Sequence, residues 1–169
     1  IHATTRIIPL GNGSVFVYPG SPVSHSWTET GRRHAVLIDT DRESVESLPL
    51  ETYYVDRFTA RVRPGHEADV LEQIRQWVSN HESEQSDLEV VLDGFVEREE
   101  REFQRALSRV SGSAALENRT RGVQHVLEHP LYRQFLDVLA EEDVAEPDAV
   151  KTRVLEVLSK LLETREIRQ

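Results

Sequence analysis

The sequence contains no cysteine and no methionine, and only two of its twenty basic residues are lysines. Without cysteine, the fold has neither a disulfide bond nor a thiolate ligand for a metal. The longest apolar runs, such as residues 15–18, are far too short to cross a bilayer, and no hydrophobic signal segment is visible. These absences predict a cytoplasmic protein without membrane contact. The lack of an initiating methionine predicts a fragment or a processed product.

Acidic residues dominate the charged side chains: thirty of them face twenty basic ones, for a formal net charge of −10. An acidic surface poor in lysine suits a protein that stays soluble at high salt, which predicts a halophilic source; an ordinary acidic protein is the alternative. Net charge bears on solubility and association rather than on fold. Because a negative surface repels phosphates, any contact with nucleic acid has to be local.

The first fifty residues have the pattern of strands joined by tight turns. Residues 11–13 (Gly-Asn-Gly) favour the positive φ angles of a hairpin turn. Four consecutive apolar residues, 35–38, predict a strand that is buried on both faces. The expected strands are 4–9, 14–18, 34–39 and 45–50.

The middle of the chain predicts an α/β unit of strand, helix, strand and helix. In the strand 53–62, Phe58, Ala60 and Val62 alternate with Arg57, Thr59, Arg61 and Arg63, so the arginines share the face opposite the apolar one. The next elements expected are a helix through residues 70–78, a strand 88–92 that ends at Gly94, and a helix 97–110.

The last third predicts helices. Residues 111–113 read as a linker, and an apolar helical stripe extends over 123–139 with a break at Pro130. A final helix starts at Pro147. Together with the strands before them, these helices predict the α+β fold class.

Features near the start of the chain resemble a known family. Residues 1–3 (Ile-His-Ala) precede the hairpin, residues 18–21 (Tyr-Pro-Gly-Ser) follow it, and Gly31 precedes the strand 34–39. This order is similar to the end of the calcineurin-like metallophosphoesterase domain, where a Gly-His-x-His metal motif comes before the closing strands. The α/β unit resembles the capping domain of the SbcD-type subfamily, the nuclease subunit that acts in repair of DNA double-strand breaks. The resemblance covers roughly residues 1–110.

The resemblance implies three regions. Residues 1–50 would supply the closing strands of the metallophosphoesterase β-sandwich, residues 51–112 a small α/β capping domain, and residues 113–169 a helical C-terminal region. The intact protein would be a metal-dependent DNA repair exonuclease that hydrolyses phosphodiester bonds with two divalent ions, of which manganese is the expected one.

The resemblance also assigns candidate residues. His2 would be a metal ligand, bound as a neutral imidazole, with a terminal residue of no function as the alternative. The other ligands belong to the family's N-terminal half, so no residue of this chain is assigned as catalytic and the chain alone is expected to be inactive. Gly20, Ser21 and His25 are candidate substrate-binding residues, although a surface turn is the simpler interpretation. Ser21 lacks the flanking pattern of a serine-hydrolase nucleophile.

Two further patterns concern anions and metals. Arg57, Arg61 and Arg63 are candidates for contact with the DNA backbone, because guanidinium groups suit phosphate; ordinary ion pairs are the alternative. His125, Glu128 and His129 match a His-x-x-Glu-His pattern, but Pro130 disturbs that turn and no third ligand follows. A solvated helix face is therefore expected there.

Other functions and partners stay open at this point. The alternatives are a phosphoesterase that acts on nucleotides or other small substrates, and a non-catalytic module that binds a partner. The family resemblance implies that the C-terminal helices dock onto an SMC-type ATPase subunit, whereas two apolar stripes can also satisfy each other as a helical hairpin. Homodimerisation is left open.

Overall fold

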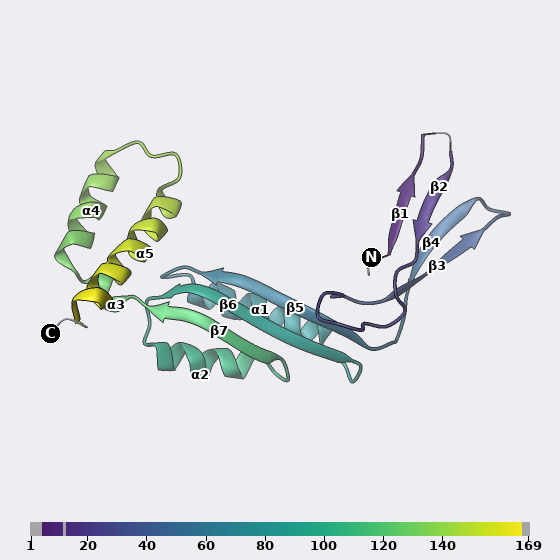
Figure 1. Cartoon of the computed structure of the whole chain (residues 1–169), viewed down its shortest axis with the longest axis horizontal. Coiled ribbons are helices and arrows are strands. Elements are labelled where there is room, and N and C mark those ends of the chain that lie inside the picture. The colour runs from purple at the N-terminus through teal and green to yellow at the C-terminus, as the bar shows by residue number, and fades with distance from the viewer. Residues whose placement is uncertain (1–4, 12, 167–169) are drawn as a thin grey trace. The chain divides into compact units, whose positions relative to one another are not determined.

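The computed structural model describes residues 5–11 and 13–166, and it has a mixed α/β fold (Figure 1). The strands are β1 (Arg6–Pro9), β2 (Val15–Tyr18), β3 (His34–Asp39), β4 (Ser44–Pro49), β5 (Tyr54–Val62), β6 (Ser86–Val96) and β7 (Ala115–Gly122). The helices are α1 (Glu67–His81), α2 (Glu100–Val110), α3 (Gln124–Leu127), α4 (Pro130–Glu141) and α5 (Pro147–Glu166). The chain divides into two compact units, and each of them contains part of β5, β6 and β7.

Two antiparallel hairpins open the described chain, as the turn signals predict. β1 pairs with β2 through partners such as Arg6 and Tyr18, and the backbone N–H of Leu10 donates to Ser14 at 2.7 Å. β3 pairs with β4, and the carboxylate of Asp39 accepts the backbone N–H groups of Asp41 and Arg42 at 3.0 Å each. The side chain of Asp39 therefore fixes the second turn.

The prediction that residues 35–38 are buried on both faces is wrong. Leu37 is 50% exposed and Ile38 is 57% exposed. β3 belongs to a two-stranded sheet with β4 as its one neighbour, and no further layer of the described chain covers these side chains. A continuous apolar run is typical of a central strand, which has a neighbouring strand on each side and a layer on each face. The described residues supply neither around β3.

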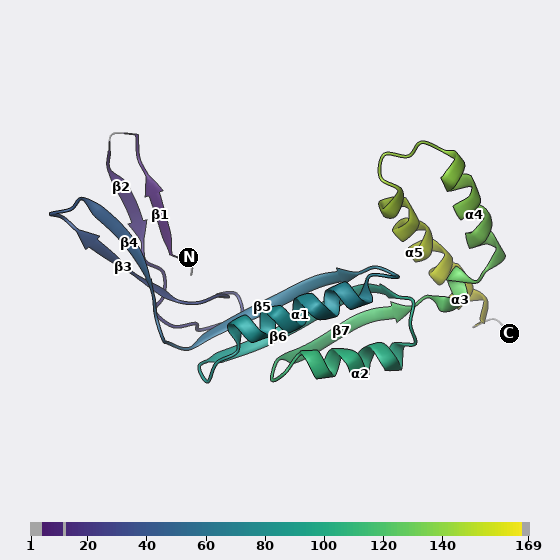
Figure 2. The same ribbon diagram turned by 180° about the vertical axis from the view of Figure 1, so that it is seen from behind.

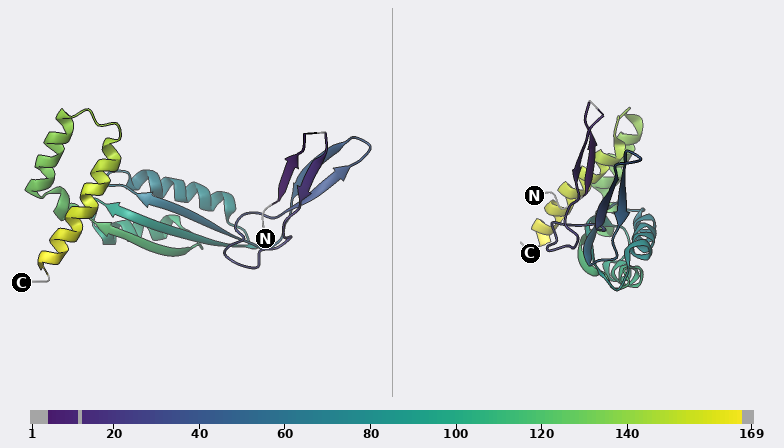
Figure 3. Two further views of the ribbon diagram at one scale, coloured as in Figure 1. Left: turned by 45° about the horizontal axis from the view of Figure 1, so that its top comes forward. Right: turned by 90° about the vertical axis from the view of Figure 1, so that its right-hand side faces the viewer.

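The α/β unit forms as predicted, with one strand more. β5, β6 and β7 form a sheet in that order, and their arrows point the same way (Figure 3). Helices α1 and α2 lie on one face of this sheet (Figure 2), as two right-handed crossovers in the same direction require. The side chains that are buried in these elements are mainly aliphatic: Val62, Val70, Ile74, Val78, Leu88, Val90, Leu92, Val96, Phe103 and Leu107.

Strand β6 does not end at Gly94, contrary to the prediction. It continues to Val96, and Gly94 adopts a φ of +108°. A Cβ atom at this position would lie 2.2 Å from the carbonyl oxygen of Val62 on β5. The glycine therefore marks a close approach between two strand backbones. Such an approach, and not only the end of a strand, explains a glycine at this position.

Residues 115–122 form β7, a strand that the sequence analysis missed. Its composition is polar and carries few of the branched apolar residues that indicate strands. Polar contacts with α2 anchor it instead: Asn118 donates to Gln104 at 2.6 Å, and the backbone N–H of Gly122 donates to Glu100 at 2.6 Å.

The C-terminal helices confirm the predicted break at Pro130, which occupies the first turn of α4. His129 is the N-cap residue, and its Nδ1 accepts the backbone N–H of Leu131 at 3.2 Å. Phe95, Val123, Val126, Tyr132 and Leu155 form the buried cluster of this region. No helix in the described part of the chain is both long enough and apolar enough to cross a membrane.

Candidate functional site

The candidate metal ligand, His2, lies outside the described residues. Among the residues that the structure does describe, no group of three or more histidine, aspartate and glutamate side chains could hold a metal ion. His125 belongs to α3 and His129 caps α4, so the two histidines of the His-x-x-Glu-His pattern do not share one helix. The described residues therefore offer no ready-made group of ligands that His2 could complete.

The loop that carries Gly20, Ser21 and His25 is fixed to the start of β5. Its buried member is Ser24, whose hydroxyl donates to the carbonyl of Glu29 at 2.9 Å and accepts the backbone N–H of Val55 at 3.2 Å. The buried Arg33 donates to the same carbonyl of Glu29. These contacts make Ser24 an anchor of the loop, a role that the sequence analysis did not foresee.

Gly20, Ser21 and His25 themselves occupy the accessible part of this loop. Gly20 has a φ of +77°, as a tight turn requires, and Ser21 is half-buried. The His25 side chain is exposed, while its backbone N–H donates to the carboxylate of Glu29 at 2.9 Å. Their contact with substrate stays a prediction.

The alternation predicted for β5 is confirmed. Phe58 faces α1, where its ring lies 5.6 Å from that of Trp77, and Arg57 points to the opposite side. The Nε of Arg57 lies 2.5 Å from the carboxylate of Glu89 on β6, and its guanidinium lies 5.7 Å from the ring of Trp27. This arginine is therefore held between a carboxylate and an aromatic face.

Arg61 is ion-paired with Glu156 on α5, and Arg153 donates to the other oxygen of that carboxylate at 2.7 Å. Hydrogen bonds from Arg153 and Arg61 lower the pKa of Glu156 below its usual value. Arg63 lies elsewhere, in a hollow of about 160 Å³ that Asp148 and Lys151 also line. Arg57 and Arg61 share one face of β5, whereas Arg63 follows the end of the strand, and the three arginines have different neighbours.

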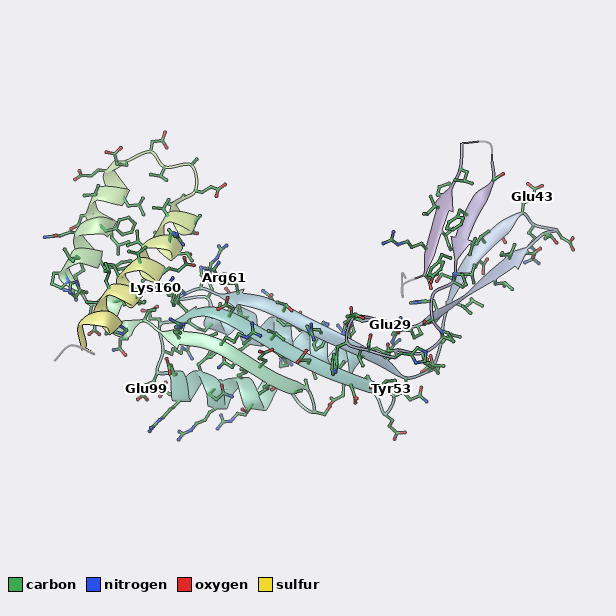
Figure 4. All side chains as sticks on the ribbon, viewed as in Figure 1. Glu29, Glu43, Tyr53, Arg61, Glu99 and Lys160 are labelled. Carbon is green, nitrogen blue, oxygen red and sulfur yellow. The ribbon has the colours of Figure 1, made fainter. Side chains whose placement is uncertain are left out.

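A larger hollow surrounds Arg61, at the end of the sheet that lies against α5. Its volume is about 380 Å³, and two of its lining residues are Arg61 on β5 and Lys160 on α5, which are labelled in Figure 4. Four cationic and two acidic side chains give its lining a net charge of +2, in a chain whose net charge is −10. The lining residues are Arg61, Asp93, Gly94, Phe95, Arg119, Arg121, Glu156, Ser159 and Lys160.

Sequence reasoning found only Arg61 among these residues. Arg119 and Arg121 alternate along β7 in the same way as the arginines of β5, so a strand at residues 115–122 would have placed them on one face. Glu156, Ser159 and Lys160 have the i, i+3, i+4 spacing of one helix face.

A third hollow, of about 670 Å³, lies near the start of α2. Its charged lining residues are Arg98 and Arg101 together with Glu99, Glu100 and Glu128, which gives a net charge of −1 if His125 is neutral. This hollow therefore offers no excess of positive charge to an anion.

No protein-family model matches the chain, and no curated protein matches it significantly. A proposal about the function of the chain therefore depends on its own sequence and structure.

Proposed function

We propose that this chain is the C-terminal part of a two-metal phosphoesterase that hydrolyses phosphodiester bonds in DNA. The observation that carries the proposal is the exposed apolar surface of β1 to β4. The large apolar side chains that these strands expose are Ile7, Ile8, Val15, Phe16, Leu37, Ile38 and Leu48. Strands of this kind are stable in the middle of a larger sheet, because neighbouring strands and a second layer bury such side chains.

The β-sandwich of a phosphoesterase domain would supply those layers. In this arrangement β1 to β4 are the closing strands of the sandwich, and the sheet of β5 to β7 with α1 and α2 is the capping domain. A cysteine-free chain also suits the reducing cytoplasm, which we take as the compartment of the intact protein.

The metal ions belong to the intact protein rather than to this chain. The described residues do not fit a metal site by themselves, because they provide no cluster of three or more ligands. We propose His2 as one ligand of the pair of ions, manganese in the first place, with the remaining ligands in the preceding part of the protein. No step of the reaction is assigned to residues of this chain.

The role that we propose for the sheet is contact with the DNA backbone. Arg57 and Arg61 lie at exposed positions of β5, Arg63 directly follows the end of that strand, and guanidinium groups bind phosphate oxygens through two parallel hydrogen bonds. Arg57 and Arg61 now hold carboxylates, which a phosphate of similar geometry can replace. Contacts of this kind position a duplex without reading its sequence.

The role that we propose for α4 and α5 is docking onto an SMC-type ATPase. Most of their apolar residues pack within the helical region, including Phe135, Leu136 and Leu158. Some apolar surface remains after this packing, as docking requires. The exposed residues are Leu131, Val138, Val157 and Leu161, which are 56%, 59%, 46% and 56% exposed.

The test uses the longer protein with His2→Ala and, as a matched control, His66→Ala. His66 is exposed and pairs with Asp69, three residues later, so its loss removes one imidazole far in sequence from the proposed ligand. We expect His2→Ala to lower manganese-dependent hydrolysis of DNA by about 100-fold, because a missing ligand disturbs the two-ion site. Equal activities of the two variants would refute the assignment. If the protein hydrolyses mononucleotides but leaves DNA uncleaved, the small-substrate alternative is favoured.

A further inference from the structure

We propose that the hollow between the sheet and α5 is a phosphate-binding site, in which Ser159, Arg119, Arg121 and Lys160 hold the oxygens of a phosphoryl group. All of these residues belong to one compact unit of the chain. The proposal does not depend on the phosphoesterase assignment, because it rests on the lining of the hollow alone.

The first observation that supports a phosphate site is the buried hydroxyl of Ser159. It is only 3% exposed and lines the hollow, yet its hydroxyl has no hydrogen-bond partner among the described residues. Hydroxyl groups in helices usually donate to the carbonyl four residues earlier. Thr152 in the same helix does so, with 2.8 Å to the carbonyl of Asp148, and Ser108 in α2 does so at 2.9 Å to Gln104.

An unpaired buried hydroxyl is unfavourable for folding, so a group of this kind indicates that something else satisfies it. The hydroxyl oxygen of Ser159 is buried in the chain without ligand, and a change of its side-chain rotamer would let it donate to an oxygen of a bound anion. Its neighbour Lys160 lines the same hollow, so α5 offers a hydroxyl and an ammonium group side by side in sequence. Both are standard donors to phosphate.

The second observation that supports a phosphate site is the charge of the side chains that line the hollow. The two carboxylates of the hollow already accept hydrogen bonds: Glu156 from Arg61 and Arg153, and Asp93 from the backbone N–H of Gly94 at 2.7 Å. Arg119, Arg121 and Lys160 also interact within the protein. Arginine has five donors and lysine three, so one internal contact leaves further donors for a ligand.

The size of the hollow fits a phosphorylated ligand. A volume of about 380 Å³ falls within the roughly 300–1,000 Å³ of ordinary small-molecule sites. A free phosphate, a nucleotide and one phosphodiester of a nucleic-acid strand all present the same oxygens. The experiment therefore has to separate these three sources.

The chain of 169 residues is titrated with inorganic phosphate, with AMP and with a single-stranded oligonucleotide, in a buffer free of phosphate and sulfate. Backbone amide resonances of Gly94, Ser159 and Lys160 report on the hollow. We expect saturable shifts with at least one probe. The probe that binds most tightly then identifies the natural source of the phosphoryl group. Inorganic phosphate stands for the free ion, AMP for a nucleotide, and the oligonucleotide for a backbone phosphodiester.

Ser159→Ala and Arg121→Gln are the test variants, and Ser108→Ala and Arg133→Gln are their matched controls on exposed positions outside the hollow. We expect each test variant to weaken binding by about tenfold or more, as a hydrogen bond to a charged ligand predicts. Neither control should change it. Without ligand, Ser159→Ala should unfold at a temperature no lower than the original chain, because its hydroxyl makes no hydrogen bond within the described residues.

The proposal is overturned if none of the probes gives saturable shifts at the hollow. It is also overturned if Arg133→Gln weakens binding as much as Arg121→Gln, since that would indicate general attraction to positive charge. Failure of the His2 experiment on DNA hydrolysis leaves this test unaffected.

Discussion

Arg61 on β5 and Glu156 on α5 form an ion pair across ninety-five positions of the sequence. Arg153, one turn earlier on α5, donates to the same carboxylate. This pair joins the sheet to the last helix at the edge of the hollow that Ser159 and Lys160 line. Glu156 therefore links two elements of the fold and also offsets part of the positive charge of that hollow.

The link should depend on pH. Hydrogen bonds from Arg153 and Arg61 lower the pKa of Glu156 in the folded chain, so its ionised form stabilises the fold. This stabilisation is present above the unfolded pKa, about 4.3 for glutamate, and is lost as the pH falls through the lower folded value. We expect Glu156→Gln to lower the free energy of unfolding at pH 7 and to have no effect below the folded pKa.

Urea unfolding at several pH values measures this difference. The exposed Glu141 on α4 provides the control, because Glu141→Gln removes one charge of the same sign from the helical region. A difference that persists unchanged at the lowest pH would show that Glu156 acts through packing rather than through its charge.

Gly94 should tolerate no side chain. Gly94→Ala places a methyl group 2.2 Å from the carbonyl oxygen of Val62 and forces alanine to a φ of +108°. The unfavourable φ alone costs about 1–3 kcal/mol, and the backbone clash adds to it. We therefore expect unfolding free energy to fall by more than about 3 kcal/mol.

Gly31→Ala is the matched control, because Gly31 has a φ of +93° with open space around the position of its Cβ. It should show the cost of the φ angle without the clash. Thermal or urea unfolding compares the two variants, and equal destabilisation would show that the strands separate to accept the methyl group.

Local patterns predicted most of the fold. The turn residues located both hairpins, the alternation in β5 placed its arginines, and Pro130 marked the start of α4. Two of the errors, the end of β6 at Gly94 and the missed strand β7, share a cause: both features depend on neighbours distant in sequence, a strand backbone in one case and α2 in the other. Such contacts leave no periodic signal in the residues themselves.

The hollow beside α5 was harder to predict than the fold. Its charged residues come from β5, β6, β7 and α5, and each segment alone resembles an ordinary solvated face. Ser159 is notable only because its hydroxyl is buried without a partner among the described residues, a property that depends on packing. Of its cationic residues, sequence reasoning singled out Arg61 alone.

The arginines of β5 and the adjacent Arg63 should contribute to the proposed DNA binding mainly through charge. Replacement of Arg57, Arg61 and Arg63 by glutamine should weaken the binding of every sequence about equally. It should also reduce the slope of log K against log salt by about one for each phosphate that the variant no longer binds. Fluorescence anisotropy of labelled duplex DNA over a range of salt concentrations measures the slope.

A triple variant on α2 controls for the removal of three positive charges. Arg101, Arg105 and Arg109 lie on α2 and none of them is buried, so their replacement by glutamine changes net charge by the same amount on another element. Equal slopes for the two triple variants would show that Arg57, Arg61 and Arg63 do not bind the DNA backbone.

The proposed docking of α4 and α5 onto an SMC-type ATPase is best tested with surface substitutions rather than with a truncation. A cut before residue 118 would remove most of β7 and break the sheet, so failure to bind would not identify the helices as the docking surface. Replacement of Leu131, Val138, Val157 and Leu161 by glutamine leaves the buried cluster intact, because each of these side chains is about half exposed or more.

We expect this fourfold variant to fold normally but to co-purify with the ATPase at a much lower yield, since an apolar interface weakens when polar groups replace its exposed side chains. Replacement of Gln134 and Asp137 on α4 by alanine is the control, because both are polar and neither is fully buried. Circular dichroism confirms that the helices are retained. Full recovery of the ATPase with the fourfold variant would mean that α4 and α5 stabilise their own region of the fold and contribute nothing to a partner.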